Sequence, residues 1–272
     1  MWHIPKPNLE ETLDDVEEFA RLGIITSAEI PALKQLVRDY DTQKANVTLQ
    51  QLGNISSVSA KKIHDKYSET YAGKKLSIIR DDLFENIAYC PYCGINERGS
   101  LDHYMAKSTY QALALCRLNL VPMCMICNRL KSNRSSVDFI NPYYFVNPGV
   151  EFFVCTISLS RTDVVFSFSI KQNALPDCQL TNSLINQISV VDLSNRLDKA
   201  VVSYLQEDIF SENDSPQLLI ASLPSLIQKK EQNVKMFNHW KTAVLKGLDR
   251  FIKGNVSVAQ QVLDALNRQM YY

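Results

Sequence analysis

Residues 90–133 read CPYCGINERGSLDHYMAKSTYQALALCRLNLVPMCMICNRLKSN, and this stretch decides how the chain is interpreted. Each end carries a pair of cysteines with two residues between them, Cys90 with Cys93 and Cys124 with Cys127. A CxxC pair puts two thiolates on one tight turn, and two such pairs can surround a tetrahedral zinc ion. The sequence therefore predicts a structural Zn²⁺ site with these four ligands.

The separation of the two pairs indicates that they enclose a larger structure. The intervening segment, residues 94–123, is longer than a plain zinc ribbon needs. Disulfides or ordinary buried thiols are the alternative interpretation, and clustered thiols in a reducing compartment more often bind metal. The remaining cysteines, Cys116, Cys155 and Cys178, have no partner at ligand spacing, so we expect them to be core residues.

Three further motifs follow one another inside this stretch. After CPYCG come LDHY at 101–104, NLVP at 119–122 and CNRLK at 127–131. In this order and at this spacing they resemble the HNH (ββα-metal) endonuclease family in its zinc-containing form. The resemblance covers roughly one sixth of the chain, and it implies a central ββα-metal module held together by Zn²⁺.

The resemblance also implies a role for four polar residues. His103 would be the general base, because a neutral imidazole can accept a proton from water near pH 7. Asp102 and Asn128 would hold a catalytic divalent ion, and a carboxylate with an amide oxygen suits a hard ion such as Mg²⁺ or Mn²⁺. Asn119 would fix the His103 ring or the loop that carries it.

Charge is balanced over the whole chain but not over this stretch. The chain has 272 residues, with 29 basic and 29 acidic side chains, so any positive surface must be local. Residues 90–134 carry six basic and two acidic side chains, as expected of a face that approaches phosphate. We expect nucleic-acid contacts from Lys107, Arg129, Lys131 and Arg134, whereas a solvated surface is enough to explain Arg98 and Arg117.

The flanking sequence predicts an α+β protein in three regions. Residues 1–88 place apolar side chains at helical spacing and form an expected N-terminal helical region. Residues 89–140 are the expected nuclease module. Residues 141–272 are expected to hold a β-hairpin, with strands over 152–159 and 164–170, and then helices. No signal peptide or membrane-spanning stretch is visible, so a cytoplasmic protein is expected.

Together these features predict a metal-dependent endonuclease that hydrolyses phosphodiester bonds. Family habit favours DNA as the substrate, and RNA stays open. The resemblance to prokaryotic HNH proteins implies an effector in anti-phage defence or restriction, acting beside an ATPase or another defence-system partner. Two other functions stay open as well: a non-catalytic zinc-stapled module that binds nucleic acid or protein, and an RNA-cleaving toxin.

Overall fold

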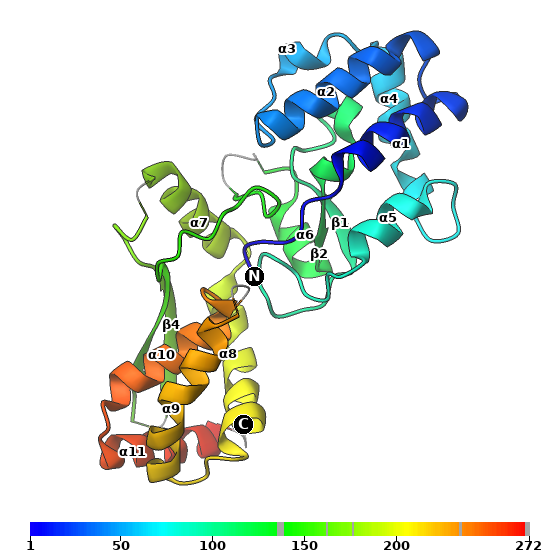
Figure 1. Cartoon of the computed structure of the whole chain (residues 1–272). Helices are drawn as coiled ribbons and strands as arrows, with labels where there is room; N and C mark the ends of the chain where they lie inside the picture. Colours follow the sequence, from blue (N-terminus) through cyan, green and yellow to red (C-terminus); the bar gives the residue numbers. More distant parts are fainter. Residues whose placement is uncertain (135–138, 162, 176, 234–235, 270–272) are drawn as a thin grey trace. The chain divides into compact units, whose positions relative to one another are not determined.

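The computed structural model describes residues 1–134, 139–161, 163–175, 177–233 and 236–269. The chain divides into two compact units (Figure 1). The N-terminal unit comprises residues 2–146, and the C-terminal unit comprises residues 147–272 together with Met1. The expected N-terminal helical region and the expected zinc module therefore lie almost entirely in one compact unit.

Amphipathic helices make up the first part of the N-terminal unit. The side chain of Asn8 caps α1 by accepting a hydrogen bond from the backbone N–H of Glu10 at 2.8 Å. Helix α1 buries Leu13, Val16 and Phe19, which recur at helical spacing. The helices are α1 (Leu9–Arg21), α2 (Ile30–Thr42), α3 (Leu49–Leu52), α4 (Ser57–Asp65) and α5 (Ser77–Phe84), with 3-10 turns η1 (Ser27–Glu29) and η2 (Lys66–Thr70).

A small antiparallel hairpin and a helix follow in the same unit. Strand β1 (Ser100–His103) pairs with β2 (Leu120–Met123), so that His103 lies opposite Leu120 and Asp102 opposite Val121. The connection contains two 3-10 turns, η3 (Gln111–Leu113) and η4 (Arg117–Asn119). Helix α6 (Met125–Lys131) begins directly after β2 and packs on β1. Every residue of β2 is buried, so the hairpin lies inside the unit.

The C-terminal unit is built on the second hairpin, which the sequence predicts correctly. Strand β3 (Phe153–Leu159) pairs with β4 (Val164–Ile170), and alternate side chains are buried. Helix α10 (Trp240–Ile252) packs on β3, and Gly247 permits the approach because an added Cβ would lie 2.8 Å from the carbonyl oxygen of Cys155. The other helices are α7 (Cys178–Val190), α8 (Leu193–Tyr204), the π-helical turn η6 (Leu205–Phe210), α9 (Pro216–Glu231) and α11 (Val256–Gln269).

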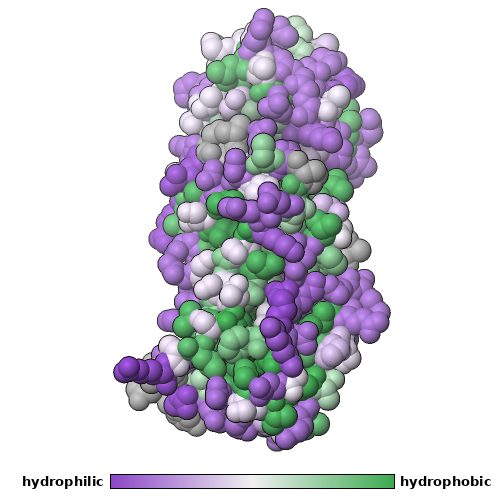
Figure 2. Space-filling view, turned by 90° about the vertical axis from the view of Figure 1, so that its left-hand side faces the viewer, coloured by the Kyte–Doolittle hydropathy of each residue, from purple (hydrophilic) through white to green (hydrophobic). Residues whose placement is uncertain are grey.

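The fold is thus a mostly helical α+β arrangement with two small antiparallel hairpins. Apolar and polar side chains share its surface, as Figure 2 shows for one face. Single apolar residues such as Val165 and Leu218 are 44% and 50% exposed, which is ordinary for a folded chain. None of the helices in the described ranges has the length and apolar character that a bilayer span requires.

Candidate active site and zinc centre

The four cysteines of the two CxxC pairs meet in the N-terminal unit. Cys90, Cys93, Cys124 and Cys127 are all buried, and their sulfur atoms lie within 4.8 Å of one another. Zinc–sulfur bonds of about 2.3 Å in a tetrahedron would set neighbouring sulfurs about 3.8 Å apart. The sulfurs of Cys93 and Cys124 are 3.9 Å apart, so the donor set and its spacing fit a structural zinc ion.

Local backbone turns bring each pair of sulfurs together. The N–H of Gly94 donates to the carbonyl oxygen of Cys90 at 2.8 Å, and Gly94 has a φ of 62°, which a glycine adopts without strain. Cys124 caps α6, since its sulfur accepts from the N–H of Cys127 at 3.4 Å. The four thiols share hydrogen bonds, which hold the pKa of the Cys124 thiol far below its usual value, whereas burial raises the pKa of the Cys90 thiol.

The other three cysteines only partly follow the expectation of core positions. Cys116 and Cys155 are buried, and burial raises the pKa of each thiol to about 12. Cys178 is exposed, so the expectation of a core position is wrong for this residue. It is the first residue of α7, where its side chain stays outside the apolar core.

A cavity of about 570 Å³ opens beside the four-cysteine cluster and brings three of the predicted site residues together. Asp102 and His103 reach it from β1, and Asn128 reaches it from α6. Its other lining residues are Tyr67, Tyr71, Ala72, Arg80, Gly99, Ser100, Leu101, Ala106, Lys107, Met125, Ser132 and Asn133. The wall therefore combines residues of the central motifs with residues of the N-terminal helices.

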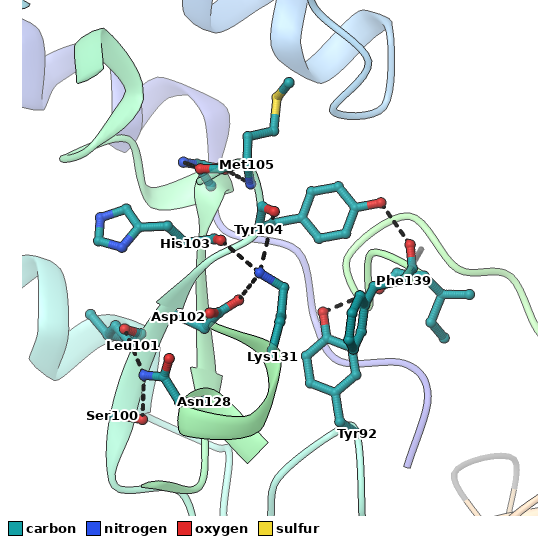
Figure 3. A network of polar contacts seen from close by, with 12 residues as sticks. Tyr92, Ser100, Leu101, Asp102, His103, Tyr104, Met105, Asn128, Lys131 and Phe139 are labelled. Carbon is teal, nitrogen blue, oxygen red and sulfur yellow. Dashed lines mark hydrogen bonds and ion pairs between the residues drawn. The ribbon is translucent and has the colours of Figure 1, made fainter. Parts of the chain in front are cut away.

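Asp102 lies in an ion pair inside the unit (Figure 3). The amine of Lys131 is 3.0 Å from Oδ2 of Asp102, and the two side chains are 0% and 4% exposed. The contact lacks the alignment of a hydrogen bond at Oδ2, so it is an attraction between charges. Burial raises the pKa of Asp102 to about 6, and the Lys131 charge opposes that rise. The ion pair therefore favours the ionised form of this buried carboxyl group.

One ring nitrogen of His103 contacts the backbone. Its Nε2 lies 3.0 Å from the carbonyl oxygen of Ala114, a contact that assigns the proton to Nε2 and leaves a lone pair on Nδ1. The ring also packs against that of Tyr67, with centroids 4.6 Å apart. Burial lowers the pKa of His103 to about 3. The imidazole is therefore neutral near pH 7, and its burial also makes it a weaker proton acceptor than a solvated imidazole.

Asn119 holds the backbone around His103 and makes no hydrogen bond to the ring. Its amide nitrogen donates to the carbonyl oxygens of Met105 at 3.1 Å and Leu113 at 3.2 Å. Its oxygen accepts from the N–H of Met105 at 2.8 Å and from the hydroxyl of Tyr40 at 3.0 Å. These bonds connect the backbone at Met105, just after β1, with the backbone at Leu113. The next residue is Ala114, whose carbonyl oxygen contacts the His103 ring.

Asn128 lies in the middle of α6 with its amide near β1. Its amide nitrogen donates to the hydroxyl of Ser100 at 3.0 Å and lies 3.5 Å from the carbonyl oxygen of Leu101. The side chain is half-buried and lines the cavity. With the nitrogen directed at β1, the amide oxygen is the atom left to serve as a ligand.

The basic residues expected to contact phosphate occupy different surroundings. Arg129 and Arg134 are exposed, and Lys107 is half-buried at the cavity. Lys131 differs from the expectation, because its amine is buried and donates to the carbonyl oxygen of His103 at 3.0 Å besides pairing with Asp102. This buried amine is not placed to contact a phosphate, and its charge is paired with the Asp102 carboxylate instead.

Arg117 is also buried, although it was expected at a solvated surface. Its guanidinium forms ion pairs of 2.6 Å with Asp15 of α1 and with Asp82 of α5. This group connects η4 to two N-terminal helices. The charge excess of residues 90–134 is therefore partly neutralised inside the unit, which the linear sequence could not show.

Sequence reasoning missed the contribution of the N-terminal helices to the cavity. Tyr67, Tyr71 and Arg80 belong to the expected N-terminal helical region, to which the sequence assigned no part of the site. Tyr71 is 49% exposed, while Tyr67 donates its hydroxyl proton to the carbonyl oxygen of Leu101 at 2.9 Å. The interleaving of aromatic and basic residues over 67–80 was the available signal, and their meeting at the cavity depends on the fold.

Comparison of this chain with models of known families, with curated proteins and with solved structures gave no match. The four-cysteine cluster and the side chains around the neighbouring cavity are therefore the basis for a functional proposal.

Proposed function

We propose that this chain is a metal-dependent endonuclease of the HNH type. The observation that carries the proposal is one cavity lined by Asp102, His103 and Asn128 beside the four-cysteine cluster. The order of two antiparallel strands followed by a helix, β1, β2 and α6, agrees with a ββα-metal module. The substrate that we propose is a phosphodiester of DNA.

His103 supplies the base in this proposal. Its Nδ1 faces no hydrogen-bond partner among the described residues, while Nε2 is held by the carbonyl oxygen of Ala114. The ring therefore can take a proton from an attacking water at Nδ1 and keep a fixed orientation. Asn119 acts as a positioning residue, because it holds the backbone on both sides of this arrangement.

Asp102 and Asn128 would hold the catalytic ion. The donor set fits Mg²⁺ or Mn²⁺, because both residues offer hard oxygen atoms and both line the cavity. Bound there, the ion would stabilise the negative charge that develops on the phosphate during hydrolysis. Lys131 would keep Asp102 ionised through the buried ion pair.

Cleavage of plasmid DNA tests the proposal directly. Purified protein is incubated with supercoiled DNA in Mg²⁺ or Mn²⁺, with His103→Ala as the inactive variant and His3→Ala as the control at an exposed histidine. We expect nicking or linearisation by the wild type and the control, and a loss of at least 100-fold in the His103 variant. A wild type that binds DNA but never cuts it would support the non-catalytic binding module instead.

The cellular role that we propose is an effector in anti-phage defence or restriction, acting in the cytoplasm beside an ATPase or other defence partner. The cleavage assay is therefore repeated with the product of the neighbouring gene. An RNA substrate of matched sequence is included, and preferential cleavage of this RNA would favour the alternative function of an RNA-cleaving toxin.

A further inference from the structure

The wall of the cavity formed by the N-terminal helices carries a group of aromatic and basic side chains. Tyr67 lies in η2, Tyr71 directly follows it, and Arg80 lies in α5. Lys107, which follows β1, completes the group. All four line the same cavity as Asp102.

The aromatic rings are arranged as a platform. The rings of Tyr67 and Tyr71 meet edge to face with centroids 5.9 Å apart. The Tyr67 ring is fixed by its hydroxyl bond to Leu101 and by its contact with the His103 ring. Tyr71 is 49% exposed and lines the cavity, so part of this residue is open to a molecule bound there.

The two cations of this group have free hydrogen-bonding capacity. The guanidinium of Arg80 lies 5.0 Å from the Tyr71 ring centroid, and its Nε donates to the carbonyl oxygen of Thr70 at 3.2 Å. The amine of Lys107 lies 4.8 Å from the Tyr67 ring centroid. Within the described part of the chain, neither Arg80 nor Lys107 has a carboxylate oxygen within 4.0 Å.

These surroundings fix the cations without neutralising them. By contrast, Arg117 and Lys131 in the same unit each form an ion pair with a carboxylate. The Arg80 guanidinium also lies over the Phe84 ring and next to the Tyr67 hydroxyl, and its planar NH₂ groups have the geometry that suits phosphate oxygens. An exposed aromatic ring beside unneutralised cations is the combination that binds single-stranded nucleic acid, through stacking on bases and charge contacts with the backbone.

We propose that this wall is a nucleotide subsite for a single-stranded segment of DNA. An unpaired base stacks on the Tyr71 ring, and Arg80 and Lys107 bind the adjoining phosphates. A base inside a duplex has both faces covered by its neighbours, so the platform selects unpaired or frayed strands. The inference rests on the proposed nuclease function and adds a substrate class, single-stranded or locally opened DNA.

Binding by a catalytically silent protein tests the subsite without relying on cleavage. His103→Ala protein is titrated onto a labelled single-stranded oligonucleotide and onto a blunt duplex of the same sequence. Adding Tyr71→Ala should weaken single-strand binding about tenfold, whereas Tyr71→Phe keeps the ring and should bind normally. Adding Arg80→Met should reduce the salt slope of binding by about one. Lys74→Met, at an exposed lysine outside the cavity lining, should leave that slope within error.

The outcomes separate this inference from the nuclease itself. If the wild type cuts plasmid DNA but Tyr71→Ala and Arg80→Met bind like the parent, the subsite is overturned and the nuclease stands. If the wild type never cuts but the two substitutions still weaken binding, the subsite is supported and the protein is a non-catalytic binding module. Equal affinity for single strand and duplex also overturns the proposal. Far-UV circular dichroism on each variant checks folding, and Arg80→Lys, which keeps the charge, should retain the salt slope.

Discussion

The amine of Lys131 lies 3.0 Å from Oδ2 of Asp102, and both side chains are buried between α6 and β1. Removing one member should leave the other charge unpaired in the interior. We expect Lys131→Met to lower the free energy of unfolding by about 3–5 kcal/mol, measured by urea denaturation. The double variant Asp102→Asn with Lys131→Met should be clearly more stable than the single variant, since no buried charge is left. Equal stability of the two would show that the ion pair is not the cause.

The four-cysteine cluster should make the fold depend on zinc. Elemental analysis of purified protein should find one zinc ion per chain, with the four buried sulfurs as ligands. Cys93→Ser should lose zinc and show a lower melting temperature, because metal binding contributes directly to folding. Cys178→Ser replaces an exposed cysteine and should change neither quantity. Full zinc content in Cys93→Ser would contradict the assignment.

Asn119 should be needed for stability and for the position of His103. Asn119→Ala removes four hydrogen bonds in a fully buried position. A loss of about 2–4 kcal/mol is expected, because several buried backbone groups lose their partners. Tyr40→Phe removes only the hydroxyl bond to Asn119 and should cost about 1 kcal/mol. Similar losses in the two variants would mean that the backbone bonds of Asn119 contribute little.

The buried guanidinium of Arg117 should stabilise the contact of η4 with α1 and α5. Arg117→Met leaves the carboxylate of Asp15, only 12% exposed, without its cation. We expect a loss of about 3 kcal/mol in thermal or chemical denaturation. Glu11 is the matched control, since its carboxylate is 57% exposed and 3.8 Å from the guanidinium. Glu11→Gln should cost less than about 1 kcal/mol, and a larger loss would assign the effect to overall charge.

Glu29 should give part of the stability a dependence on pH. Burial is the largest single effect and raises the pKa, but the hydrogen bonds from Thr26, Ser56 and Ser59 together outweigh it and lower the pKa from 4.5 to about 2. A lowered pKa in the folded state means that ionised Glu29 stabilises the fold above pH 4.5 and that the benefit disappears as pH falls towards 2.

The variant Glu29→Gln should therefore melt below the wild type at pH 7. The difference in melting temperature should narrow as the pH falls below about 4.5, measured by differential scanning fluorimetry over a pH series. A constant difference down to pH 3 would show that the carboxylate charge is not responsible. Gln50→Ala, at an exposed residue of α3, serves as the pH-independent control.

Short-range patterns were enough to predict several parts of this molecule. The CxxC spacing identified the four sulfurs that cluster, because two residues between cysteines fit one tight turn wherever the turn lies. Two runs rich in β-branched and aromatic residues, on either side of a short polar turn, located β3 and β4 to within a residue at each end. The motif order also placed Asp102, His103 and Asn128, which the fold brings to one cavity.

Short-range patterns could not predict which charged side chains are buried or which residues they contact. Lys131 and Arg117 look like surface cations in the sequence, yet each is buried against a carboxylate contributed by another element, Asp102 in β1 and Asp15 in α1. Likewise Tyr71 and Arg80 reach the cavity only because η2 packs on α5 and α5 packs on β2. The sequence by itself determined which atoms could bind metal or accept a proton, since that chemistry belongs to the side chain. The tertiary structure alone decided which charges are neutralised and which face the cavity, because electrostatic contacts depend on distances between segments far apart along the chain.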